Sequence, residues 1–498
     1  MNRTTTNPGT ILMKLLSIAA MAASALLSAN AIAAVQGVVG PTFSLQAKAD
    51  YTSQPDGAQI YTWGYGCNGA ATLQAYTGGS GPAPSCGAMQ LPGPTLIVTE
   101  GDTVSVTLTN NLPAAAGNTS ILFPGFQLTS TSGGVAGLRT QEAAPGNPVT
   151  YNFTATKPGT YAYYSGTQSD LQIEMGLFGA VVVRPAVAPT GSARAGCTSG
   201  SSSLASFAYD NDATCYDREF LFQFSEMDSR VHRDVLDQVT ACPTAPCGAL
   251  EVTMEPYRAN YFLINGRSMP DLMDAPYSAA YPNQPYNGNP QIHPGEKLLM
   301  RVVGQGRWQH PFHFHGNHAR VLARDGNLLL SAADGTSLAG PLLFTIATVS
   351  GQSVDAIFTW SGKGLNWDVY NHTAGDGSVC TPDANGYYTS ASSPPAPLTA
   401  PNYGEWCADH LKAIPVTPPD PQIVANGQWY GGTPYLGLNG FNPVNLPPGT
   451  LNQNPGAGYA YMWHSHNERE ITTNDVFPGG MLMMLIVQPP QFPIDETQ

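Results

Sequence analysis

The amino-acid sequence predicts an all-β protein built from two similar domains, and three observations carry this prediction. Only 11% of the 498 residues are charged, whereas the chain contains 53 Gly and 43 Pro, a composition that favours turns and argues against helical bundles. Short segments alternate polar and apolar residues with a period of two, as half-buried strands do. The order of these segments early in the chain is repeated late in the chain, which indicates two copies of one β-domain.

The first copy of the repeat contains three segments that we expect to form strands. Residues 103–109 alternate polar with apolar side chains, and residues 159–166 and 176–183 begin with Gly and are rich in Tyr and Val. Aromatic and β-branched residues between glycines are typical of strands. The second copy repeats this order at residues 294–303, 458–466 and 479–487.

The second copy also contains a long insertion. The interval from Gly295 to Tyr459 is much longer than the matching interval of the first copy, and we place the additional residues at about 362–458. This stretch is rich in Pro, Gly, Asn and Ser, and a loop of such length needs packing of its own. We expect Cys380 and Cys407 to tie it with a disulfide.

The N-terminus has the pattern of a secretory signal peptide. Arg3 and Lys14 precede an apolar run at residues 15–27, and small residues at 29–34 follow it. We therefore expect a periplasmic or secreted protein, and no later stretch is apolar for long enough to predict a transmembrane segment. The predicted parts are a signal peptide at 1–34, a first domain at 35–185, a linker at 186–214 and a second domain at 215–490.

The net charge and the cysteines are consistent with an exported protein. A formal net charge of −14 argues against nucleic acid as a partner. The eight Cys fall into four neighbouring pairs, and an oxidising compartment would allow all of them to form disulfides. The sequence does not determine the connectivity, and sequential pairing is the simplest arrangement. The four neighbouring pairs are Cys67 and Cys86, Cys197 and Cys215, Cys242 and Cys247, and Cys380 and Cys407.

Histidine provides the main chemical signal. Residues i and i+2 of a strand point to the same face, so His313 with His315, and His464 with His466, each present two imidazoles in one direction. If the two strands are neighbours, up to four imidazoles converge. Such a donor set suits Cu, Zn or Fe better than Mg or Ca. Six of the ten His lie in two clusters, and the remaining four, His232, His293, His372 and His410, stand alone in the sequence and are given no role. The clusters are His310, His313, His315 and His318, and His464 and His466.

On these motifs the chain resembles the multicopper oxidases, the laccase-like proteins built from cupredoxin domains. The resemblance implies two Greek-key β-sandwich or barrel domains of cupredoxin type, copper as the cofactor, and a small-molecule or metal-ion substrate. The two repeats resemble most the two-domain laccases, which implies a homotrimer. The matching segments are residues 93–95, 100–102, 110–113, 176–179 and 262–266, and His310-Pro311-Phe312-His313-Phe314-His315-Gly316 is the most specific.

The ligand set departs from that of the family. Where the family has four histidines in the first domain, this chain has residues 122–125 and 164–166, none of which is His. The second domain keeps all four positions that correspond to the trinuclear copper cluster. The blue-copper site keeps His310, but its Cys aligns with Ser465 and its second His with Glu470. A hydroxyl cannot replace a thiolate, so ordinary blue-copper laccase activity is not expected.

Two hypotheses follow from the sequence, which leaves open whether the protein is an enzyme. In the first, the histidines of the second domain bind copper, or else zinc or iron, and give a metal-binding protein or a mononuclear oxidoreductase. In the second, the cupredoxin scaffold is a non-catalytic structural or interaction module without metal. The candidate ligands of the first hypothesis are His310, His313, His315, His464, His466 and Glu470.

Overall fold

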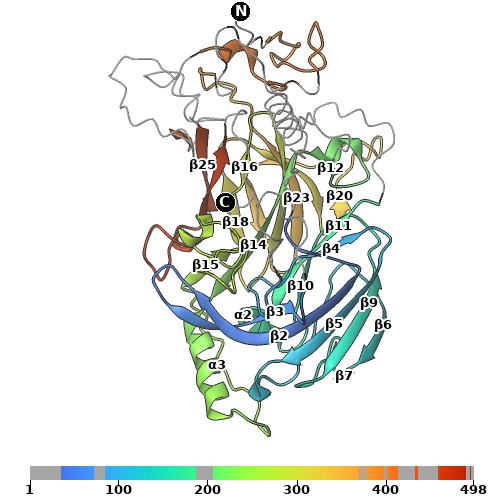
Figure 1. Ribbon diagram of the computed structural model, residues 1–498, viewed down its shortest axis with the longest axis vertical. Helices are drawn as coiled ribbons and strands as arrows, with labels where there is room; N and C mark the ends of the chain where they lie inside the picture. Colours follow the sequence, from blue (N-terminus) through green and yellow to red (C-terminus); the bar gives the residue numbers. More distant parts are fainter. Residues whose placement is uncertain are drawn as a thin grey trace, which may run out of the picture.

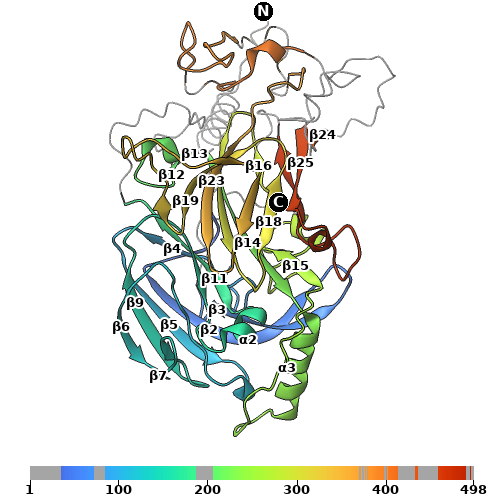
Figure 2. The same cartoon turned by 180° about the vertical axis from the view of Figure 1, so that it is seen from behind.

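The computed structural model describes most of both predicted domains and part of the insertion. The described residues are 35–71, 85–186, 206–368, 379–397, 402–412, 432–435 and 458–488, together with single residues at 372, 375, 377, 400 and 494. Strands dominate them, and two β-structures lie end to end (Figures 1 and 2). The prediction of an all-β, cupredoxin-like fold class is confirmed. No helix in this described part of the chain has the length and apolar character needed to cross a bilayer.

The first domain is a sandwich of two sheets. Strand β5 (Thr103–Asn111) alternates buried with partly or fully exposed residues, as its period-two sequence predicts, and pairs antiparallel with β9 (Pro148–Thr154). One sheet has the order β1 (Val38–Val39), β4 (Leu96–Thr99), β11 (Phe178–Arg184) and β10 (Gly159–Tyr164). The other has the order β3 (Gln59–Cys67), β2 (Thr42–Ser53), β5 (Thr103–Asn111), β9 (Pro148–Thr154) and β6 (Leu128–Gly133). A separate ribbon joins β7 (Val135–Ala136) and β8 (Gln141–Glu142).

The second domain repeats this plan with larger sheets. The antiparallel pair β25 (Gly458–Ser465) and β26 (Leu482–Val487) corresponds to the pair β10–β11 of the first domain, as the repeat predicts. One sheet has the order β15 (Tyr261–Ile264), β14 (Arg218–Met227), β17 (Lys297–Gly304), β23 (Ser353–Thr359), β19 (Ala319–Arg324) and β20 (Asn327–Leu328), with β21 (Leu342–Leu343) beside β19. The other has the order β16 (Gln291–Ile292), β26 (Leu482–Val487), β25 (Gly458–Ser465), β18 (His310–Phe314) and β22 (Thr345–Thr348), with β24 (Gly432–Tyr435) beside β25.

Each domain encloses its own buried apolar cluster, and helix α3 (Ser229–Ala241) links them. Asp228 caps this helix by accepting a hydrogen bond from the Arg230 N–H, as N-terminal Asp residues commonly do. Val231 and Val235 of α3 pack into the core of the first domain, although the helix follows β14 of the second. The other helices among the described residues are short: α2 (Ser169–Glu174), η1 (Ala114–Ala116), η2 (Asp212–Thr214), η3 (Asp271–Met273), η4 (Cys407–Asp409) and η6 (Glu468–Ile471).

The end of the predicted linker is ordered structure. Residues 206–214 contain β12 (Ser206–Phe207) and η2, and β12 pairs with β13 (Cys215–Tyr216). Ala208 and Tyr209 pack against Leu299 and Leu322 of the second domain. The two aromatic residues Phe207 and Tyr209 could have shown that this part of the Gly- and Ser-rich segment is not a linker.

Three of the four predicted disulfides are present. They join Cys67 to Cys86, Cys242 to Cys247, and Cys380 to Cys407, each to its nearest neighbour in sequence. The fourth predicted pair includes Cys197, which lies outside the described residues. The described part of the insertion is the orange segment at the end of the molecule opposite the first domain (Figures 1 and 2).

Candidate metal centre

Strands β18 and β25 bring the two histidine pairs together. They are antiparallel neighbours in the same sheet, and His313 lies directly opposite His464. His315 follows the end of β18, where its N–H donates a hydrogen bond to the Met462 carbonyl. The expectation that the two histidine-bearing strands are adjacent is confirmed.

Three imidazoles form a compact group. One ligand nitrogen from each of His313, His315 and His464 lies within 4.8 Å of the other two, and all three residues are buried. The Nε2 atoms of His315 and His464 are 3.3 Å apart. The exposed His466 is at the edge of the group, with its ring centroid 4.9 Å from that of His313. The structure thus gathers all four histidines of the two H-x-H motifs.

A backbone contact fixes the tautomer of His464. Its Nδ1 lies 2.7 Å from the carbonyl oxygen of Ser465, and a carbonyl oxygen only accepts. Nδ1 therefore carries the proton, and Nε2, the nitrogen that faces His315, carries the lone pair. Orientation of a ligand histidine through its second nitrogen is a general feature of metal sites.

Burial and neighbouring imidazoles lower the pKa values of two members of the group, His313 and His464. Burial and the nearby His315, His464 and His466 lower the pKa of His313 from 6.5 to about 4. Burial also lowers the pKa of His464, with a further contribution from His466. Neutral imidazole is the form that binds a metal, so the group offers lone pairs at neutral pH without prior loss of a proton.

His310 lies outside this group. Its Nε2 is 2.8 Å from Glu226, and its Nδ1 is 2.8 Å from Glu470. Burial acts to lower the pKa of His310, but hydrogen bonds to Glu226 and Glu470 outweigh it and raise the pKa to about 9. His310 is therefore a buried imidazolium between two carboxylates, with both ring nitrogens engaged.

Ser465 and Glu470 complete this arrangement. Ser465 Oγ donates a hydrogen bond of 2.5 Å to Oε2 of Glu470, the same oxygen that faces His310. The side-chain amide of Asn467 donates to the other oxygen of Glu470 at 2.9 Å. Where the family resemblance places a copper-ligating Cys and a second His, this chain therefore has a hydrogen-bonded polar network.

Sequence reasoning missed Glu226. It lies on β14, in the other sheet of the domain, and is buried together with its neighbours in residues 221–227. Oε1 of Glu226 also accepts hydrogen bonds from the N–H groups of Arg307 and Trp308. The position of Glu226 within an apolar strand could have revealed its role, because a buried carboxylate requires hydrogen-bonding or charged partners.

The two first-domain segments that replace the family's histidines meet in space. Leu122 and Tyr164 form a β-bridge with backbone hydrogen bonds of 2.7 and 3.2 Å. The ring of Phe123 packs against Phe153, with 4.8 Å between centroids, and against Tyr163. Hydrocarbon and aromatic side chains fill this region, so it offers no imidazole to a metal.

The protein thus has two β-sandwich domains, and its histidine cluster lies on two neighbouring strands, β18 and β25, of one sheet. Residues 86–187 match the family model described as multicopper oxidase. The resemblance to multicopper oxidases inferred from the sequence is therefore confirmed, and the family match lies in the first domain.

The relatives are similar over short stretches. Laccase abr2 of Aspergillus fumigatus is 39% identical over 98 residues, which cover 19% of this chain and 16% of that protein. Multicopper oxidase MCE of Talaromyces pinophilus is 39% identical over 98 residues, covering 19% and 15%. The chain thus matches only about a sixth of the length of these curated relatives.

Solved structures align over more of the chain but at low identity. The multicopper oxidase mgLAC is 17% identical, with a TM-score of 0.47 and coverage of 91% of this chain and 87% of that one. The blue copper oxidase from Nitrosomonas europaea is 15% identical, with a TM-score of 0.46 and coverage of 89% and 85%.

The family implies copper, and the residues present fit only part of its copper complement. Three buried imidazoles, with a fourth at the edge, suit one transition-metal ion. A trinuclear cluster does not fit, because the first domain contributes no histidine. A blue-copper centre does not fit either, since it needs a thiolate where the chain has Ser465, and since both nitrogens of His310 are engaged by carboxylates.

Proposed function

We propose that the second domain binds one copper ion through His313, His315 and His464, with His466 at its exposed edge. The observation that carries this proposal is the convergence of three buried imidazoles whose ligand nitrogens lie within 4.8 Å of one another. Small side-chain rotations bring such nitrogens to the bond lengths of about 2.0–2.1 Å typical of imidazole ligands.

Copper is favoured among the metals that imidazole binds. Affinity for divalent ions of the first transition row generally increases to Cu²⁺ and is lower for Zn²⁺ and Fe²⁺. Zinc and iron are therefore the competing occupants, to be distinguished by metal analysis. The lack of a carboxylate among the three buried ligands disfavours Mg²⁺ and Ca²⁺.

The activity that we propose for this site is that of a mononuclear oxidoreductase acting on a small molecule or a metal ion. A bound copper would supply one-electron redox chemistry. The chain's own contribution is positional: the Ser465 carbonyl orients His464, and the exposed His466 leaves one side of the site open to solvent. Ordinary laccase activity is not part of the proposal, because the residues lack a route for electrons through a thiolate copper.

A metal-free scaffold is the second candidate function, and one observation favours it. His315 and His464 contact each other at 3.3 Å, and His313 Nδ1 lies 2.9 Å from the hydroxyl of Thr345. The cluster is thus hydrogen-bonded without an ion, as expected of a structural or interaction module that needs no metal.

We further propose that the protein is exported to the periplasm or the exterior and assembles as a homotrimer. Three disulfides support export, because such bonds persist in oxidising compartments. The predicted signal peptide at residues 1–34 lies outside the described residues. The trimer rests on the family resemblance alone.

Metal analysis of protein purified from its native compartment tests the proposal. We expect about one copper per chain, and we expect the double variant His313→Ala/His464→Ala to lose it while the control His318→Ala retains it. His318 is a suitable control because it packs on Phe344, outside the cluster. Wild-type protein that binds no copper in a titration would overturn the proposal and leave the scaffold function.

A further inference from the structure

The insertion of the second domain contains a small packed unit of its own. Tyr388, Ala396 and Tyr403 form a separate buried cluster, against which Cys380 and Cys407 pack as a disulfide. A cluster of this size buries little apolar surface, and units this small generally depend on additional cross-links. The polar side chains beside the disulfide are therefore candidates for such a cross-link.

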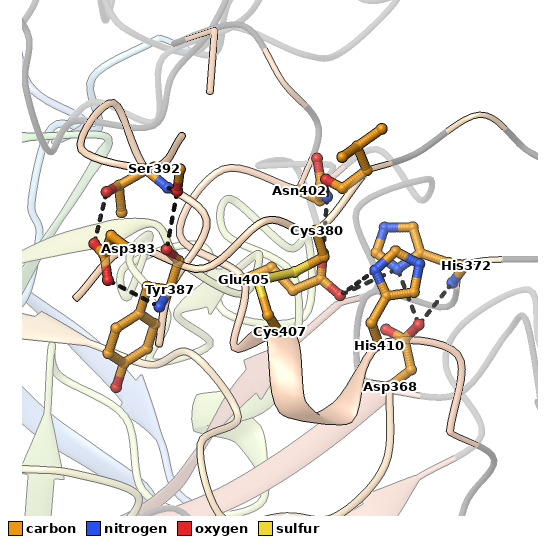
Figure 3. Close-up of a disulfide and its surroundings, with 12 residues drawn as sticks. Asp368, His372, Cys380, Asp383, Tyr387, Ser392, Asn402, Glu405, Cys407 and His410 are labelled. Carbon is orange, nitrogen blue, oxygen red and sulfur yellow. Dashed lines mark hydrogen bonds and ion pairs between the residues drawn. A yellow bond between two sulfur atoms is a disulfide. The ribbon is translucent and has the colours of Figure 1, made fainter. Parts of the chain in front are cut away.

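His372, Glu405 and His410 converge next to this disulfide (Figure 3). One ligand atom from each lies within 4.8 Å of the other two. Nδ1 of His372 is 3.3 Å from Glu405 Oε1, and Nδ1 of His410 is 3.5 Å from the same oxygen. The two imidazole rings are stacked, with centroids 4.5 Å apart. None of these residues belongs to the cluster between β18 and β25.

The carboxylate of Glu405 is held in place with one oxygen directed at the two histidines. Its Oε2 accepts a hydrogen bond of 2.8 Å from the Asn402 side chain, whose amide also donates to the Val379 carbonyl. Among the described residues its Oε1 faces only the imidazoles of His372 and His410, and it makes no hydrogen bond of good geometry, although Glu405 is only 1% exposed. A buried carboxylate oxygen without a hydrogen bond is costly unless a cation is close to it.

Asp368 adds a second carboxylate at the rim of the group. Its Oδ2 lies 2.9 Å from Nδ1 of His372 and accepts a hydrogen bond from the Leu411 N–H at 2.8 Å. Asp368 and Glu405 are both buried, so two neutral histidines and one divalent cation would balance the charge of the pocket. Balance of this kind is what permits carboxylates to lie away from water.

The distances match those between neighbouring ligands of one ion. With bonds of about 2.0–2.1 Å, adjacent ligand atoms are about 2.9 Å apart at right angles and about 3.4 Å apart at tetrahedral angles. The observed separations of 2.9, 3.3 and 3.5 Å among these nitrogen and oxygen atoms fall in this range. Two histidines and one carboxylate form a common ligand set for Zn²⁺.

We propose that the insertion holds a second metal site, in which His372, Glu405 and His410 bind Zn²⁺ with Asp368 as the fourth donor. The ion joins His372 to the segment at 405–410, and the disulfide joins Cys380 to the same segment. Metal and disulfide together cross-link segments within the insertion. This site is independent of the copper site proposed above.

Zinc titration of the full chain in the His313→Ala/His464→Ala background tests this site alone. We expect one zinc per chain, and we expect Glu405→Gln to weaken binding at least tenfold. Gln keeps the shape of the side chain and an oxygen for Asn402. Asp383→Asn is the matched control, since Asp383 lies in the same insertion and contacts Thr389 and Tyr387 instead (Figure 3).

X-ray absorption at the zinc edge provides a second measurement on the same samples. We expect nitrogen and oxygen ligands that include two imidazoles and no sulfur. The proposal is overturned if the background protein binds no zinc, if Glu405→Gln binds as tightly as its parent, or if the ligands include sulfur. Thiol titration establishes that the Cys380–Cys407 bond has formed in each variant.

Discussion

Ser465 Oγ donates a hydrogen bond of 2.5 Å to Oε2 of Glu470, in the position where the multicopper oxidase resemblance places a copper-bound thiolate. The same carboxylate oxygen is 2.8 Å from His310, whose other nitrogen is 2.8 Å from Glu226. Four side chains thus satisfy one another in the interior. This network satisfies the buried polar groups at a place where the resemblance implies a metal site.

The first prediction concerns the spectrum of the copper-loaded protein. Because Ser465 replaces the thiolate, we expect no intense blue charge-transfer band in the wild type. We also expect none in Ser465→Cys, since Glu226 and Glu470 still occupy both nitrogens of His310. Optical absorption after copper loading measures this, and an intense blue band in the wild type would contradict it.

The second prediction concerns stability. Replacement of Glu470 by Ala leaves the His310 imidazolium with one of its two buried partners, and the loss of a buried ionic partner costs about 3–5 kcal/mol. Denaturant unfolding measures the change. The exposed neighbour Glu468 is the control, and Glu468→Ala is expected to change the free energy of unfolding by less than about 0.5 kcal/mol. Equal effects of the two substitutions would be evidence against the network.

The third prediction is the alkaline pH dependence of stability. The pKa of His310 is about 9 in the folded protein and 6.5 when unperturbed, so the folded state holds this proton more tightly. The stabilisation is complete below about pH 6.5 and is lost as pH rises through about 9. We expect His310→Asn to remove this part of the profile, which thermal unfolding between pH 6 and 10 would measure. An unchanged alkaline slope in the variant would show that another group titrates.

The fourth prediction is the acid pH dependence of the metal-free protein. The pKa of His313 is about 4 in the folded state, below the unperturbed 6.5, so the unfolded chain takes up this proton first. Stability therefore falls as pH decreases from about 6.5 to 4. His313→Asn is expected to flatten this limb, whereas His318→Asn is expected to leave it as in the wild type. Parallel acid limbs in His313→Asn and the wild type would contradict the neutral state of His313.

The sequence was sufficient to predict the strands that carry the histidine cluster. The H-x-H spacing on β18 and β25 places each pair on one face, and the internal repeat predicted that the two strands are neighbours. The role of His310 could not be predicted in this way. Its partners Glu226 and Glu470 are 84 and 160 residues away in sequence, and Glu226 lies in the opposite sheet.

The cluster in the insertion likewise depends on contacts that the sequence could not predict. His372 and His410 stand alone in the sequence, and Glu405 is one acid among many. They meet because turns and a disulfide fold the loop back on itself, and irregular backbone has no period from which such contacts can be predicted.

By itself, the sequence determined the all-β class, the repeat, the neighbouring cysteine pairs and the four histidines that face one another across two strands. These features depend on local periodicity and on spacing, which the order of residues specifies directly. Only the tertiary structure decided the protonation of these side chains and their partners. Packing of two sheets encloses His310 between carboxylates and His313 among imidazoles, so that one histidine is charged and the other neutral.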